Sequence, residues 1–151
     1  MLSYSEFGDP AAPPLMIVHG LYGSGRNWGV IAKRLSDAAR VYTIDLRNHG
    51  FSPRTSSHSY PDMAQDIAEL IEHLGRPMHI TGHSMGGKAV MVLALTRPDL
   101  LNRVVVADIA PVAYSHSQMP YIQAMRAVDL SRVTRRSEAE AQLAEQGVEP
   151  A

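Results

Sequence analysis

The feature that most constrains this chain is a serine flanked by two glycines, in the segment Gly82-His83-Ser84-Met85-Gly86. An apolar run at 78–81 precedes this segment, and a longer apolar helical pattern at 89–95 follows it. A chain that leaves a buried strand and enters a helix so abruptly has no room for side chains two positions before and after the apex, so glycine is needed there. The turn strains the backbone of Ser84 and exposes its hydroxyl at the positively polarised start of the helix. The segment therefore predicts a nucleophile elbow, and the alternative is a tight turn with an idle serine.

A second glycine-containing segment, His19-Gly20-Leu21-Tyr22-Gly23, follows another apolar run at 15–18. The negative oxygen of a tetrahedral intermediate needs two N–H donors at about 3 Å. Met85, the residue after the serine, can supply one N–H, and we expect Leu21 to supply the other from this flexible loop. The alternative interpretation is an ordinary exit from a strand. The candidates for the wall of the substrate pocket are Gly20, Tyr22, Trp28 and His83.

Composition places this 151-residue chain among soluble globular proteins, with 45% apolar and 19% charged residues. The net charge of −1 gives no electrostatic reason to expect nucleic acid or an anionic membrane as a partner. The sequence contains no apolar stretch long enough to cross a membrane and no secretory signal at its start. Without cysteine it has no disulfides or cysteine-based zinc sites. We therefore expect a cytoplasmic protein that binds no metal.

The order of apolar segments predicts an α/β fold with a mostly parallel sheet and flanking helices. Strands separated by stretches long enough for a crossover helix are parallel. A short antiparallel strand near Leu2 and Tyr4 is expected to open the sheet. The apolar run at 104–106 predicts a strand covered on both faces. The helical pattern at 63–74 ends at Gly75, and the helix at 89–95 is apolar on most sides, which predicts a buried position. The expected parallel strands lie near 15–18, 41–44, 78–81 and 104–107.

The pattern changes from about residue 112, where two shorter helical segments follow a loop. Ser137 and Glu140 have the spacing of a capping box that would start the second helix. No further strand follows, so these helices look like an insertion over the sheet. We therefore expect residues 1–113 to form the N-terminal part of the core and residues 114–151 to begin a helical lid.

Four segments resemble the N-terminal part of the α/β-hydrolases, and within that superfamily the small bacterial serine esterases of the YbfF type. The resemblance implies an α/β-hydrolase fold that is incomplete at its C-terminal end and needs no cofactor. It implies hydrolysis of small acyl esters, including thioesters, through an acyl-enzyme on Ser84. Alternatives are carbon-carbon bond hydrolysis or perhydrolysis on the same fold, or a non-catalytic binding module. The four segments are His19-Gly20-Leu21-Tyr22-Gly23-Ser24, Asp45-Leu46-Arg47-Asn48-His49-Gly50-Phe51-Ser52, Gly82-His83-Ser84-Met85-Gly86-Gly87-Lys88-Ala89 and Asp108-Ile109-Ala110-Pro111-Val112.

The same resemblance implies the other members of a catalytic triad. Asp108 is expected to be the acid, and its alternative role is to cap a turn at the end of a strand. The family takes its catalytic histidine from near its C-terminus, beyond residue 151, and His49 and His116 are weak substitutes. We therefore expect the C-terminal remainder of the enzyme to be a second polypeptide or to be absent from this chain.

The segment 45–52 contains several polar residues that could suggest a second site. We interpret them instead as an ion pair and a turn that brace this loop. The residues concerned are Asp45, Arg47, His49 and Ser52.

Overall fold

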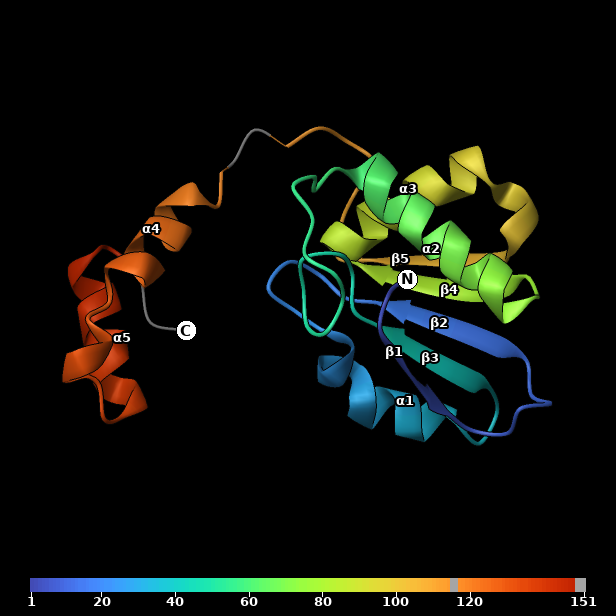
Figure 1. Cartoon of the computed structure of the whole chain (residues 1–151), viewed down its shortest axis with the longest axis horizontal. Helices are drawn as coiled ribbons and strands as arrows, with labels where there is room; N and C mark the ends of the chain where they lie inside the picture. Colours follow the sequence, from blue (N-terminus) through green and yellow to red (C-terminus); the bar gives the residue numbers. More distant parts are fainter. Residues whose placement is uncertain (115–116, 149–151) are drawn as a thin grey trace. The chain divides into compact units, whose positions relative to one another are not determined.

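A five-stranded sheet with the order β1-β3-β2-β4-β5 organises the first part of the chain (Figure 1). Strand β1 pairs antiparallel with β3, and the other neighbours are parallel. The structure, a computed structural model, describes residues 1–114 and 117–148. The predicted α/β fold and its antiparallel first strand are confirmed. The strands are β1 (Tyr4–Phe7), β2 (Pro14–Val18), β3 (Arg40–Ile44), β4 (Met78–His83) and β5 (Leu101–Ala107).

Helices cover both faces of this sheet, and alternating residues of β2 show how. Met16 and Val18 belong to the main apolar core with residues of α2 (Tyr60–Leu74) and α3 (Met85–Thr96). Ile17 points to the opposite face and packs with Ala32 of α1 (Gly29–Leu35). Side chains alternate between the two faces of a strand, so one strand contributes to both cores. The short helices η1 (Gly25–Trp28) and η2 (Pro98–Leu100) precede α1 and β5.

Helix α2 shows how the sequence sets its own boundaries. The Ser59 hydroxyl caps its start by accepting a hydrogen bond from the N–H of Asp62 at 3.3 Å, and Pro61 lies in the first turn. Gly75 ends the helix with a φ of 76°, and its N–H donates to the carbonyl of Ile71 at 3.0 Å. The expected end at Gly75 is confirmed.

Two expectations about burial are wrong. Val104 and Val105 of β5 are 40% and 55% exposed. Among the described helices, α3 is the one that packs on this strand, so one face of β5 stays uncovered. Leu95 of α3 is 84% exposed, because this helix packs on the sheet and on α2 with one side and its remaining side stays uncovered. The apolar residues on all sides of α3 in the sequence did not reveal that only one side of this helix is covered.

The chain divides into two compact units, Met1–Pro111 and Val112–Ala151. The second unit contains α4 (Met119–Ala127), η3 (Leu130–Arg132) and α5 (Arg136–Glu145). The expected capping box at Ser137 is wrong, because the carboxylate of Glu138 accepts hydrogen bonds from the N–H groups of Thr134 and Arg135 at 2.7 and 3.1 Å. The helix therefore begins one residue before Ser137. That this unit begins a lid stays a prediction.

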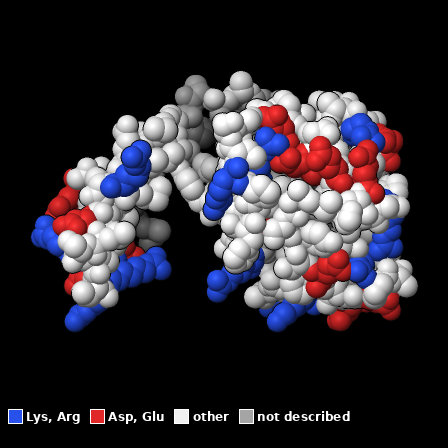
Figure 2. All heavy atoms as spheres, viewed as in Figure 1, with Lys and Arg blue, Asp and Glu red and all other residues white. Residues whose placement is uncertain are grey.

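The charged residues of the chain are mixed in sign on the face drawn in Figure 2, where Asp and Glu lie among Lys and Arg. This distribution agrees with the net charge of −1. None of the helices in the described part of the chain combines the length and the apolar character that a membrane crossing requires.

Candidate functional site

The turn from β4 into α3, residues 82–86, is called the Ser84 turn below. Ser84 has a φ of 50° and a ψ of −116°, a conformation that costs a residue with a side chain on the order of 1–3 kcal/mol. A Cβ on Gly82 would lie 2.6 Å from the carbonyl oxygen of Gly86. A Cβ on Gly86 would lie 2.4 Å from the carbonyl oxygen of His19. The strained serine and the need for both glycines agree with the expectation from the sequence.

The loop after β2, residues 19–23, lies directly against this turn and is called the β2 loop. A Cβ on Gly20 would approach Nδ1 of His83 to 2.9 Å and Cβ of Ser84 to 3.3 Å. The N–H of Gly23 donates to the carbonyl of Gly20 at 3.0 Å, and Tyr22 between them has a φ of 62°. Gly20 therefore lets the β2 loop pass close to the serine.

Two backbone N–H groups beside Ser84 are candidates for binding an oxygen. Met85 is the first residue of α3, and the N–H groups of a first helical turn have no acceptor within their own helix. Leu21 follows Gly20 in the β2 loop, and its side chain is exposed. The structure thus places both expected donors in segments that meet at the serine.

Asp108 follows the end of β5, the strand next to β4. The carbonyl of Ala107 accepts a hydrogen bond from the N–H of Ser84 at 2.9 Å, which fixes this strand end beside the Ser84 turn. Asp108 has a φ of 58°, and its side chain is 83% exposed. Its Oδ2 lies 3.5 Å from Nε2 of His83. The structure therefore brings the expected acid close to the turn, where its carboxylate faces His83.

His19 has a structural role between the two loops. Its ring is buried, and its Nε2 accepts a hydrogen bond from the N–H of Leu46 at 3.0 Å. The proton of this neutral ring is therefore on Nδ1, which donates to the carbonyl of Gly20 at 2.7 Å. Burial lowers the pKa of His19 below its ordinary value. Both nitrogens are used in holding the β2 loop, so His19 is not available as a base.

His49, one of the two weak substitutes for the base, is held in the loop after β3. The ring of His49 lies 5.0 Å from that of His19 and 5.5 Å from that of His58, with its Nδ1 donating to the carbonyl of Arg47 at 3.0 Å. His116 lies outside the described residues. Within the described ranges, His, Asp and Glu form no group of three suited to hold a metal ion.

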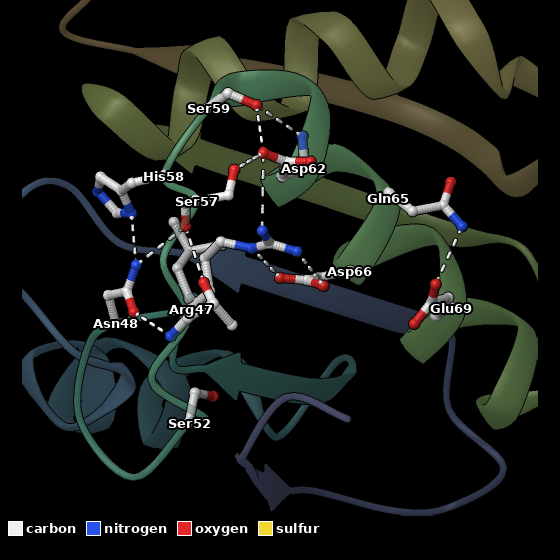
Figure 3. A network of polar contacts seen from close by, with 12 residues as sticks. Arg47, Asn48, Ser52, Ser57, His58, Ser59, Asp62, Gln65, Asp66 and Glu69 are labelled. Atoms are coloured by element: carbon white, nitrogen blue, oxygen red, sulfur yellow. Dashed lines mark hydrogen bonds and ion pairs between the residues drawn. The ribbon is translucent and has the colours of Figure 1, made fainter.

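The polar segment 45–52 is a braced loop, as interpreted from the sequence. Arg47 donates to both carboxylate oxygens of Asp66 in α2, at 2.6 and 2.8 Å (Figure 3). Asp45 accepts hydrogen bonds from the N–H groups of Gly25 and Phe51 at 2.7 and 2.8 Å. The Ser52 hydroxyl donates to the Asp45 carbonyl at 2.5 Å. These contacts hold the loop to α2 and to the start of η1.

A groove of about 360 Å³ opens beside the β2 loop. The Trp28 and His83 rings meet in an edge-to-face arrangement with centroids 5.8 Å apart, and both line the groove. Ile31 of α1 also lines the groove and was not foreseen, because the segment between the first two parallel strands was recognised only as long enough for a helix. A larger cavity of about 740 Å³ near β1 and α1 contains none of the expected site residues. The groove is lined by His19, Gly20, Leu21, Tyr22, Gly23, Asn27, Trp28, Ile31 and His83.

Known proteins resemble this chain in sequence and in fold. A sequence of the sn-1-specific diacylglycerol lipase ABHD11 from Mus musculus is 42% identical over 144 residues, which cover 91% of this chain and 47% of that protein. Esterase YbfF of Escherichia coli is 45% identical over 103 residues, covering 67% of this chain and 40% of that protein. A solved structure of a marine microorganism esterase superposes with a TM-score of 0.86 at 41% identity, covering 96% of this chain and 58% of that one.

The chain spans about half the length of the curated relatives it matches. The family model described as alpha/beta hydrolase fold matches residues 13–146, which contain the β2 loop, the Ser84 turn and Asp108. The resemblance to bacterial esterases of the YbfF type is thereby confirmed at the level of the family. The chain belongs to the α/β-hydrolase fold family, of which it represents an N-terminal portion.

Proposed function

We propose that this chain is the nucleophile-bearing half of a serine hydrolase that cleaves carboxylic esters, including thioesters. The observation that carries the proposal is the strained backbone of Ser84 at the junction of β4 and α3. Similarity to an esterase and a diacylglycerol lipase supports ester substrates. A strained serine at a helix start presents its hydroxyl to a substrate without a large movement.

The first step is attack of the Ser84 hydroxyl oxygen on the ester carbonyl. A base takes the hydroxyl proton, and the carbonyl oxygen becomes negative between the N–H groups of Leu21 and Met85. Collapse of this intermediate breaks the bond to the alcohol, which leaves with the proton returned by the base. Water then attacks the acyl-enzyme by the same route and releases the acid and free Ser84. No cofactor is needed.

Asp108 is proposed as the acid that orients the base. Its position directly after β5 supports this role, because the hydrogen bond from the Ser84 N–H to the Ala107 carbonyl holds this strand end beside Ser84. Its carboxylate is 83% exposed, so a further group can approach it. We assign the base to the C-terminal half of the family fold, as a second polypeptide, because among the described residues no hydrogen bond joins a histidine to the Ser84 hydroxyl. The second unit then begins the lid of the completed enzyme.

The test uses the chain co-expressed with the C-terminal half of Escherichia coli esterase YbfF. Co-elution of the two polypeptides is the expected first result, and separate elution would overturn the assignment of the base. In the complex, a fluorophosphonate probe should label Ser84, and p-nitrophenyl esters should be hydrolysed. Ser84→Ala should abolish both reactions. Ser24→Ala, at the half-buried residue before η1, is the matched control and should leave both unchanged. Hydrolysis that persists in Ser84→Ala would overturn the proposal.

Asp108→Asn tests the acid in the same complex. The carboxamide keeps the size of the side chain but cannot stabilise an imidazolium, so the turnover rate should fall by roughly 10⁴-fold. Asp99→Asn, an exposed aspartate at the other end of β5, is the matched control and should leave the rate unchanged. An Asp108→Asn complex with unchanged turnover would assign the acid to another residue.

A further inference from the structure

The groove beside the β2 loop combines exposed apolar side chains with a position next to Ser84. Leu21 and Ile31 are 37% and 44% exposed, and both line the groove together with Trp28. Apolar side chains that remain exposed around a concave surface are typical of a binding site. Gly20 lines the groove and would place a Cβ 3.3 Å from that of Ser84, so the wall of the groove lies against the serine.

The order of the sheet determines on which side of Ser84 this groove lies. Strands β2, β4 and β5 are adjacent in this order, and they are parallel. The β2 loop, the Ser84 turn and Asp108 follow their carboxyl ends. The groove and Asp108 therefore flank Ser84 from opposite sides. The His83 ring separates them, since it lines the groove and its Nε2 is 3.5 Å from Oδ2 of Asp108.

We infer that this groove binds the acyl chain of the substrate, as an aliphatic chain of short to medium length, and not the alcohol. The inference rests on the proposed function in one respect: the departing alcohol oxygen must receive its proton from the base that Asp108 orients. The alcohol then lies on the Asp108 side of Ser84, and the acyl chain extends to the other side. There Leu21, Trp28 and Ile31 offer carbon surface. A volume of about 360 Å³ is near the lower end of small-molecule pockets, which favours a single chain.

Kinetics of the complex defined above measure the preference directly. The kcat/KM of p-nitrophenyl esters should rise from acetyl through butyryl to hexanoyl, by about two- to fourfold for each methylene that leaves water. Acetate esters of ethanol, butanol and hexanol should show no such rise. Ile31→Phe, which fills the groove, should flatten the acyl series. A rise along the alcohol series, or an acyl series that Ile31→Phe leaves intact, would overturn the inference.

Val30→Phe is the matched control, because Val30 is the preceding residue of α1, is 67% exposed and lines the larger cavity instead of the groove. The acyl series of this variant should match that of the original protein. Loss of the acyl series in both variants would show a general effect of phenylalanine on α1 and would overturn the assignment to the groove.

A second readout does not depend on hydrolysis. Trp28 is the single tryptophan of the chain, so its fluorescence reports on the groove alone. ω-Bromohexanoate, a product analogue with a quenching bromine at the chain end, should quench Trp28 saturably in the chain and in Ser84→Ala. Quenching should be lost in Ile31→Phe and retained in Val30→Phe. Saturable quenching without turnover would leave the groove assigned and overturn the proposed function, whereas turnover without saturable quenching would overturn the groove.

Discussion

The Nε2 atom of His19 accepts a hydrogen bond of 3.0 Å from the backbone N–H of Leu46. The opposite nitrogen donates to the carbonyl of Gly20 at 2.7 Å. One buried imidazole thereby joins the β2 loop to the loop that follows β3. It can do so only as a neutral ring, because a protonated Nε2 cannot accept a hydrogen bond.

We expect the stability of the first unit to fall when the pH drops below about 6.5. Burial lowers the pKa of His19 in the folded protein, whereas the unfolded chain keeps the ordinary value of 6.5. Between these two pKa values the unfolded state binds more protons, so the free energy of unfolding rises with pH there. The stabilisation is complete above pH 6.5 and is lost as the pH falls through the folded-state pKa. Urea denaturation at a series of pH values measures it.

His19→Gln is the test variant, because glutamine can still donate and accept but does not titrate. Its free energy of unfolding should depend less on pH than that of the original protein. Some dependence should remain, because desolvation also lowers the pKa of His58, with smaller effects of His49 and Arg47. His73→Gln, an exposed position on α2, is the control and should keep the full dependence. Equal pH profiles for His19→Gln and the control would refute this account.

We expect Gly20→Ala to impair Ser84 and Gly29→Ala to be harmless. The new Cβ at position 20 would lie 2.9 Å from Nδ1 of His83, so the ring and the serine beside it must move. Misplacement of a nucleophile by a fraction of an ångström to 1 Å should slow fluorophosphonate labelling of the complex by roughly 10- to 100-fold. The measurement is the labelling rate at equal probe concentration.

Gly29 is the matched control for this substitution. It has a helical φ of −57°, and a Cβ there meets nothing within 4 Å. Replacement by alanine should stabilise the chain by about 0.4–1 kcal/mol, because alanine restricts the unfolded chain more. A normal labelling rate in Gly20→Ala would show that the β2 loop adapts freely.

The local geometry of the serine could be predicted because steric requirements leave a fixed glycine pattern around it in the sequence. Gly82 is required by the carbonyl of Gly86 within the turn, and Gly86 is required by the carbonyls of Val18 and His19 in β2 and the β2 loop. The spacing of five residues records both requirements. The parallel direction of most strands was predictable in the same way, from segments between them long enough for a crossover helix. The end of α2 at Gly75 was readable because a left-handed residue there needs glycine.

Features that depend on distant segments and leave no such pattern could not be predicted. The exposure of Val105 depends on what packs against β5, which the apolar pattern of β5 itself does not contain. The fixed tautomer of His19 depends on Leu46, 27 residues away. Ile31 lines the groove because of the position of α1 in the fold. A single apolar residue in a helix does not reveal which surface it lines. The sequence pattern thus located the Ser84 turn, whereas long-range packing determined which side chains surround it.

We expect the ion pair between Arg47 and Asp66 to stabilise the fold measurably. Both side chains are largely covered, at 13% and 20% exposure, and the guanidinium binds both carboxylate oxygens. Hydrogen bonds to charged groups contribute about 1.5–3 kcal/mol, so Arg47→Met should lower the free energy of unfolding by that amount. Arg54→Met, an exposed arginine in the same loop, should change it by less than about 0.5 kcal/mol. Urea denaturation of both variants gives the comparison.

A double-mutant cycle with Asp66→Asn separates the pair from other effects. If Arg47 acts through Asp66, the second substitution should cost much less in the Arg47→Met background than alone. If the two substitutions lower the free energy of unfolding additively, the contact between Arg47 and Asp66 does not contribute to stability.

We expect the chain on its own to self-associate through β5. In the described sheet β5 is an edge strand with β4 as its neighbour, and its Val105 side chain is 55% exposed. An apolar edge with unpaired N–H and carbonyl groups is a template for pairing with another strand, and a lysine there opposes such pairing. Val105→Lys should therefore shift the chain from oligomers toward a monomer in size-exclusion chromatography with light scattering. Val30→Lys, an equally aliphatic and exposed position on α1, should leave the distribution unchanged. A chain of 16.5 kDa that stays monomeric and folded without the substitution would contradict the prediction and would show that this edge needs no partner strand.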